Sequence, residues 1–115
     1  MSKKVLVSLV ETDIEEATLR SHDLLVSTRD LGILKDIEYG KEVTKCGQMF
    51  HLLTLQGEGQ DGVLLTNGLT NIFYIKGSDG KLWAVGADWG DDVWCLFAYP
   101  VEGYGWGAGD RVFSR

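Results

Sequence analysis

Residues 72–99 read IFYIKGSDGKLWAVGADWGDDVWCLFAY, and this stretch decides the fold class. Three runs in it, Ile72–Lys76, Leu82–Ala87 and Val93–Tyr99, are rich in the β-branched and aromatic residues that are typical of strands. Short turns containing Gly, Ser and Asp separate the runs, and these residues tolerate the backbone conformations that tight hairpins need. The stretch therefore predicts three consecutive antiparallel strands.

The same reading extends in both directions along the chain. Apolar runs between turn signals predict further strands, at Val5–Val10, Leu24–Thr28, Met49–Leu55, Gly62–Thr66 and Arg111–Ser114. The spaces between strands from residue 48 onward are too short for helical crossovers, which disfavours a parallel sheet. Near the N-terminus, Thr12 and Glu15 have the spacing of a capping box, so we expect a short surface helix over residues 13–22.

The later strands are apolar on both faces. In the run beginning at Leu82, one face carries Trp83, Val85, Ala87 and Trp89, while the other carries Leu82, Ala84 and Gly86. One short N-terminal helix cannot cover so many strands. The sheet must close on itself, associate with another copy, or leave an apolar patch for a partner. We expect a strand-dominated α+β fold, with a strongly curved antiparallel sheet or partial barrel and a short N-terminal helix.

Composition limits the class of protein. The chain has 115 residues, 44% of them hydrophobic, and a formal net charge of −6, which fits a single domain over residues 1–115. An acidic chain is a poor binder of phosphate backbones, so we expect no nucleic-acid partner. No apolar stretch is long enough to span a bilayer, and the N-terminal apolar run is too short for a signal peptide. We expect a cytoplasmic protein in which Cys46 and Cys95 are free thiols.

The segment from Leu82 to Asp110 carries five acidic residues, all four tryptophans and no Lys or Arg. Carboxylates among aromatic faces suit a cationic partner, because the charge attracts the cation and the ring quadrupole also favours it. Glycine-rich backbone around residues 103–109 would let a ligand approach closely, and we expect Trp106 to lie outside the core. The predicted binding residues are Asp88, Trp89, Asp91, Asp92, Tyr104 and Trp106.

Other interpretations of these residues remain open. Asp91 and Asp92 follow Gly90, so the acidic cluster is also what a hairpin turn requires. Its spacing matches no EF-hand loop, and we expect neither a metal nor a cofactor. A glycosidase-like pair could form with Glu102, provided that two carboxyl groups line one cleft. The glycine-rich residues 57–62 contain two acids and no lysine, and are therefore interpreted as a loop rather than a phosphate cradle.

The remaining chemically active side chains favour structural roles. His51 lies among apolar neighbours in its predicted strand, which indicates a buried or half-buried histidine. Cys95 is flanked by Trp94 and Leu96, and we expect a small core hydrophobe.

These observations favour a non-enzymatic binding domain whose partner is a cationic or amphipathic small molecule or a basic protein surface. A small hydrolase using Glu102, Asp110 or His51 as general acid or base is one alternative. A homo-oligomeric structural unit is another, because two-sided apolar strands can pack against a copy of themselves.

Overall fold

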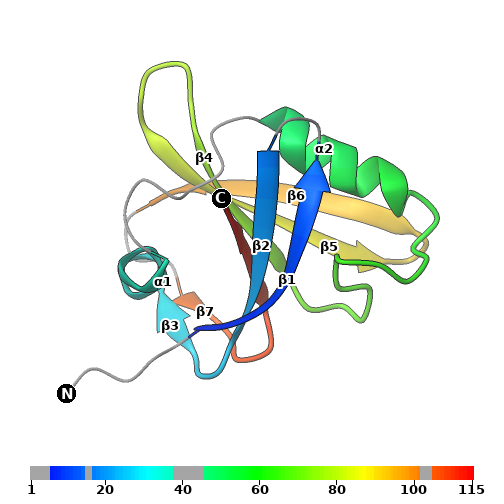
Figure 1. The fold of residues 1–115 in the computed structure, drawn as a ribbon, viewed down its shortest axis with the longest axis horizontal. Helices are drawn as coiled ribbons and strands as arrows, with labels where there is room; N and C mark the ends of the chain where they lie inside the picture. The colour runs from blue at the N-terminus through cyan, green and yellow to red at the C-terminus, as the bar shows by residue number, and fades with distance from the viewer. Residues whose placement is uncertain (1–5, 15–16, 38–45, 102–104) are drawn as a thin grey trace.

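The computed structural model describes residues 6–14, 17–37, 46–101 and 105–115, which form a mixed sheet with a helix on each face (Figure 1). The strands of this sheet follow the order β1-β2-β8-β4-β5-β6, and a short β3–β7 pair lies apart from them. The radius of gyration, 13.1 Å, is that of one compact domain of this length. The elements are β1 (Leu6–Ile14), β2 (Ala17–Leu24), β3 (Thr28–Arg29), α1 (Asp30–Asp36), α2 (Cys46–Leu55), β4 (Asn71–Lys76), β5 (Leu82–Gly90), β6 (Val93–Pro100), β7 (Gly105–Trp106) and β8 (Arg111–Ser114).

Strand β4 is buried on both faces and separates two hydrophobic cores. Phe73 and Ile75 pack with residues of α2, including Leu52 and Leu53. The alternate side chains, Ile72 and Tyr74, belong to a second core with Ile33 and Leu34 of α1. The two-sided apolar pattern of the strands is therefore explained by a helix on each face. The expected strong curvature or barrel closure is wrong, because the sheet is neither strongly curved nor closed.

The strands predicted in the C-terminal half are confirmed as β4, β5, β6 and β8, and the first strand is confirmed as β1. The expectation of purely antiparallel pairing fails at one place, because β4 and β8 are parallel. The chain between them passes through the β5–β6 hairpin and β7, so this connection brings β8 back beside β4 without a crossover helix.

The expected N-terminal helix over residues 13–22 is wrong, since the described residues of this range, 13–14 and 17–22, lie in the antiparallel strand pair β1–β2. The partner of β2 explains the difference: Arg20–Asp23 pair with β8, and Leu19 and Ser21 alternate into the interior. Local capping chemistry is a weak preference, and pairing with a distant strand overrides it. Strand β2 ends at Leu24, so the strand predicted over Leu24–Thr28 is also absent.

The run Met49–Leu55 is helical and not a strand. Met49, Leu52 and Leu53 are buried in α2, and this spacing is the period of a helix. His51 is exposed on α2, so its expected burial is wrong. Residues 62–66 form no strand. Among the described residues, neither helix has the length and apolar character that crossing a bilayer demands.

A buried polar contact joins α1, β4 and β7. The carboxylate of Asp30 is fully buried, and its Oδ1 accepts hydrogen bonds from the Tyr74 hydroxyl at 2.6 Å and from Trp106 Nε1 at 2.7 Å. Burial, together with the hydrogen bond to Asp30, raises the pKa of Tyr74 above its ordinary value. The neutral phenol is thus part of the folded state, and three segments distant in sequence meet at one oxygen atom.

Tyr74→Phe should lower the free energy of unfolding by about 1–3 kcal/mol at neutral pH, because it removes one donor from a buried carboxylate. In the native chain, stability should also fall above about pH 10, where the unfolded tyrosine ionises and the folded one does not. In the variant that fall should be shallower by about 1.4 kcal/mol per pH unit. Urea unfolding at neutral and alkaline pH measures both effects. Equal stability of the two proteins at neutral pH would contradict the proposed role of this contact.

Candidate binding surface at the acidic end

The structure divides the six predicted binding residues among different places. Asp88 and Trp89 lie in β5 and Asp91 and Asp92 in the turn after it, whereas Tyr104 lies outside the described residues. Trp106 lies in β7 and is only 5% exposed. The described members of this set come from two parts of the fold, the β5–β6 hairpin and the buried strand β7.

Trp106 is a core residue, so the expectation that it lies outside the core is wrong. Its ring stacks on Phe97 with centroids 6.1 Å apart, and its Nε1 donates to Asp30. Pairing of Trp106 with Thr28 across the short β3–β7 sheet holds this part of the chain against the α1 face. Trp106 thus anchors β7 to the α1 face.

Asp91 and Asp92 form the turn between β5 and β6. Both have positive φ angles, 53° and 62°, as the two central residues of a tight hairpin turn require. Asp tolerates this conformation better than most residues, which explains why the pair stands here. Both side chains are exposed, so the turn projects two carboxylates beyond the end of the sheet.

Below this turn, Trp89 and Trp94 face each other across β5 and β6 in an edge-to-face arrangement, with ring centroids 5.4 Å apart. Trp94 belongs to the periphery of the α2 core and donates from Nε1 to the Gln56 carbonyl oxygen at 2.8 Å. The aromatic pair thus joins the hairpin to the C-terminal end of α2.

Gln56 is the residue that shapes the next loop. Its buried side chain donates from Nε2 to the carbonyl oxygens of Gln60 and Leu64, while Oε1 accepts from the Leu64 backbone N–H at 2.8 Å. One amide side chain thereby satisfies three backbone groups, which would otherwise be costly to bury. Residues 57–64 are held in a defined path over the end of α2.

This loop lies directly against the hairpin. Gly59 has a φ of +73°, and a Cβ placed on it would overlap the indole of Trp89. Glu58 and Asp61 are exposed on the same loop. The contact therefore brings two carboxylates from residues 57–62 to the end of the molecule that already carries Asp91 and Asp92. We call these four residues, Glu58, Asp61, Asp91 and Asp92, the acidic end.

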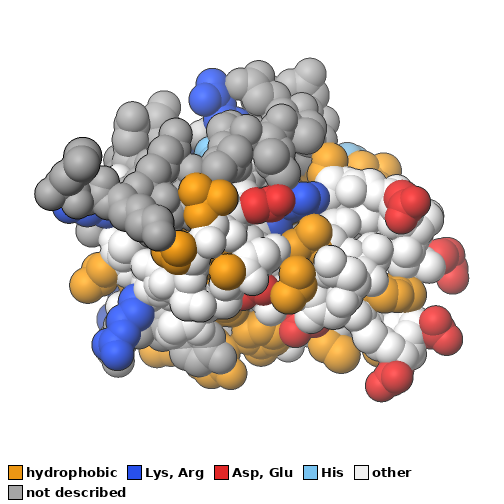
Figure 2. Space-filling model, turned by 90° about the horizontal axis from the view of Figure 1, so that it is seen from below, with side chains coloured by type: hydrophobic (Ala, Val, Ile, Leu, Met, Phe, Trp, Pro, Cys, Tyr) orange, Lys and Arg blue, Asp and Glu red, His pale blue; other side chains and the backbone are white. Residues whose placement is uncertain are grey.

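The acidic end is free of cationic side chains from its own segments, because residues 46–75 and 82–110 contain no Lys or Arg. Figure 2 shows acidic groups gathered at this end of the molecule. The guanidinium of Arg111, which donates to the Val63 carbonyl oxygen, is paired with Asp23 at 2.6 Å. Clustered charges of one sign produce a potential that attracts cations from solution. The sequence did not predict that Glu58 and Asp61 belong to this surface, because residues 57–62 were interpreted only as a loop.

Asp88 is not part of the acidic end, although it lies close to Asp91 and Asp92 in the sequence. It alternates with Trp89 along β5 and stands opposite Cys95, so its side chain lies on the sheet face turned away from α2. Its Oδ1 is buried and has no hydrogen-bond partner among the described residues. The predicted grouping of Asp88 with Trp89 therefore splits across the sheet.

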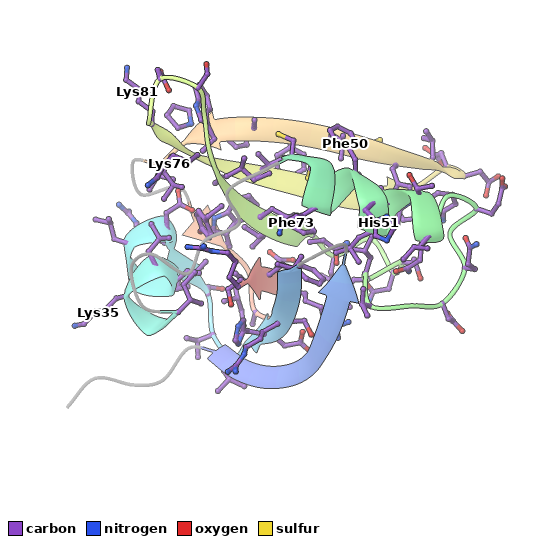
Figure 3. The ribbon with its side chains drawn as sticks, turned by 45° about the horizontal axis from the view of Figure 1, so that its top comes forward. Lys35, Phe50, His51, Phe73, Lys76 and Lys81 are labelled. Atoms are coloured by element: carbon purple, nitrogen blue, oxygen red, sulfur yellow. The ribbon has the colours of Figure 1, made fainter. Side chains whose placement is uncertain are left out.

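The described groups proposed for catalysis come from different segments, since Asp110 precedes β8 and His51 lies on α2. Both carboxylate oxygens of Asp110 accept backbone N–H groups, from Thr70 at 2.9 Å and Gly107 at 3.0 Å, which is a structural use of the side chain. His51 projects from α2 (Figure 3), and Glu102 lies outside the described residues. The described part of the chain contains no cluster of three His, Cys, Asp or Glu residues able to hold a metal ion.

Both cysteines are free and exposed. The prediction of free thiols is confirmed, but the expectation that Cys95 is a core residue is wrong. It lies on β6, an edge strand whose side chains are mostly exposed.

No protein-family model, curated protein or solved structure matches this chain.

The fit of Gly59 against Trp89 can be tested with a matched pair of glycines. Gly68 also has a positive φ, +90°, but a Cβ there would meet open space. Gly68→Ala should cost about 1–2 kcal/mol of stability for the backbone conformation alone. Gly59→Ala should cost about 1–3 kcal/mol more, because the added methyl group must displace the indole. Urea unfolding followed by tryptophan fluorescence measures the difference, and equal losses would refute the contact between loop and hairpin.

Proposed function

We propose that this protein is a non-enzymatic binding domain that receives a basic surface of another protein at the acidic end. The observation that carries the proposal is the convergence of Glu58, Asp61, Asp91 and Asp92 from two loops that contain no compensating cation. Their backbone is fixed in advance by the Gln56 hydrogen bonds and by the tight turn. A preorganised charged surface loses less conformational entropy when a partner binds.

The form of this surface favours a protein over a small organic cation. The Trp89 ring is covered by Gly59, and Trp94 is committed to the Gln56 carbonyl oxygen. Both indoles are thus in contact with the protein itself, and the four carboxylates lie on two exposed loops. A partner with several Lys or Arg side chains can span both loops, whereas a single ammonium group can reach only one.

The energetics set the kind of binding expected. An exposed ion pair contributes about 0.2–1 kcal/mol, so four of them alone give weak affinity that salt reduces further. Their larger effect is on the association rate, because complementary charge steers the encounter. The acidic end should therefore guide a basic protein into place, while contacts beyond the charges supply the remaining affinity.

A lysine decapeptide is a direct probe of this end. Backbone amide shifts in an NMR titration should concentrate in residues 57–62 and 90–93, and they should diminish as salt is added. The double variant Asp91→Asn/Asp92→Asn should weaken binding by about twofold to thirtyfold, in line with the loss of two exposed ion pairs. Asn tolerates the positive φ of both positions, so the turn itself should persist.

The matched control neutralises one acid at each end of the β5 strand. Asp92→Asn and Asp79→Asn change the net charge equally, and both side chains are exposed in turns. Only Asp92→Asn should weaken peptide binding. Equal effects of the two variants, or shifts spread evenly over the whole chain, would show attraction to net charge alone and overturn the proposal. Stronger binding of tetramethylammonium than of the decapeptide would point instead to a small-molecule site.

A further inference from the structure

Strand β6 is an edge of the sheet, and among the described residues no strand pairs with its outer side. Residues 93–101 contain no charged side chain, and Val93, Leu96 and Tyr99 are 52%, 43% and 38% exposed. Natural edge strands are usually protected by charges, bulges or proline, because their free N–H and C=O groups can pair with another chain. On β6 only Pro100, at the end, offers such protection.

The register shows which backbone groups face outward. Val101 donates its N–H to the Leu82 carbonyl oxygen. Hydrogen bonding alternates along an antiparallel strand, so the odd-numbered residues of β6 also direct their backbone N–H and C=O groups toward β5. The even-numbered residues therefore direct their backbone N–H and C=O groups away from the sheet; these are Trp94, Leu96 and Ala98. Pro100 is also outward, where its missing N–H costs no bond to β5.

We propose that this edge pairs with β6 of a second copy of the chain, in an antiparallel, two-fold symmetric dimer with Leu96 next to the axis. In this register Leu96 pairs with Leu96 of the second copy, and Trp94 pairs with Ala98. Every outward N–H of these three residues then meets an outward C=O. A two-fold interface requires such self-complementarity, since each residue must suit the position that it meets in the copy.

The side chains fit this register. The large Trp94 faces the small Ala98, and two Leu96 side chains meet at the axis. On the other face of the sheet, Val93 stands opposite Tyr99 of the second copy, so the three large exposed apolar side chains of β6 each gain a neighbour across the interface. Phe50 of α2, labelled in Figure 3, is a further large apolar side chain that is half exposed.

The charges at the two ends of the hairpin are complementary. Asp91 and Asp92 lie at the turn end of β6, whereas Lys76 and Lys81 lie at the opposite end of the sheet (Figure 3). Asp79 lies between the two lysines in the sequence. Antiparallel pairing places the acidic turn of each copy beside the Lys81 end of the other. Because the strand itself is uncharged, no like charges meet across the pair. The net charge of each copy opposes association, so the dimer should be weak and reversible.

The proposed register can be tested at Leu96, because this residue pairs with Leu96 of the second copy. Leu96→Lys and Leu96→Glu should each raise the dimer dissociation constant at least about tenfold, because like charges then stand directly opposite. An equimolar mixture of the two variants should dimerise, since Lys then faces Glu. Sedimentation velocity over a concentration series measures the approach from 12.7 kDa toward twice that mass. Dimer formation in the mixture would also show that each variant is folded and still able to pair through β6.

A crosslinking pair tests the same register independently. In a Cys46→Ser/Cys95→Ser background, Leu96→Cys should form an intermolecular disulfide on mild oxidation, because directly paired positions lie within disulfide range. Ala98→Cys is the control, since its partner is Trp94 and it should crosslink poorly.

A monomeric native chain at every concentration would overturn the proposal. So would a dimer that persists in both Leu96 variants, or equal crosslinking at positions 96 and 98. Failure of the dimer is distinguishable from failure of peptide binding at the acidic end, because the peptide titration also reports on residues 57–62, which take no part in the strand pairing.

Discussion

The burial of β4 on both faces is the constraint on which the rest of the structure depends. Its alternate side chains, Phe73 and Tyr74 most clearly, need apolar cover above and below the sheet. Helix α2 supplies one cover and α1 the other, and the Asp30 carboxylate ties α1 to Tyr74. With both faces of β4 covered, the exposed apolar side chains of the later strands lie on the edge strand β6, and four exposed acids lie in the loops at one end of the sheet. The candidate surfaces of this protein lie there for that reason.

Local chemistry made part of this fold predictable. Turn residues flanking β-branched and aromatic runs predicted β4, β5, β6 and β8, because hairpin turns have strong sequence preferences. The run Met49–Leu55 was ambiguous, since a short apolar segment fits the period of a strand and of a helix. The helix is favoured because its buried face packs against Phe73 and Phe113 in the core. The N-terminal hairpin likewise depends on pairing with β8, which no local pattern in residues 12–22 reveals.

The candidate site was predictable to a similar extent and for the same reason. Asp91 and Asp92 are placed by the turn that they form, so their exposure follows from local sequence. The burial of Trp106 depends on Asp30, 76 positions earlier in the chain. The inclusion of Glu58 and Asp61 depends on Gln56 and on the contact of Gly59 with Trp89. Such long-range contacts are set by the packing of the whole domain rather than by neighbours in sequence.

The distribution of charge along the β5–β6 hairpin links the two proposed interactions. An uncharged strand separates two acids at the turn from two lysines near the opposite end. A second copy in antiparallel register would approach Asp91 and Asp92 from the side of β6. A basic partner reaching Glu58 and Asp61 would approach from the side of the loop that Gln56 holds over α2. The turn carboxylates are therefore shared by both interactions, whereas the loop carboxylates serve only the second. When Asp91 and Asp92 lie beside the lysines of a second copy, they attract a basic partner less strongly. Dimer formation and the binding of a basic partner should therefore weaken each other slightly through these two residues.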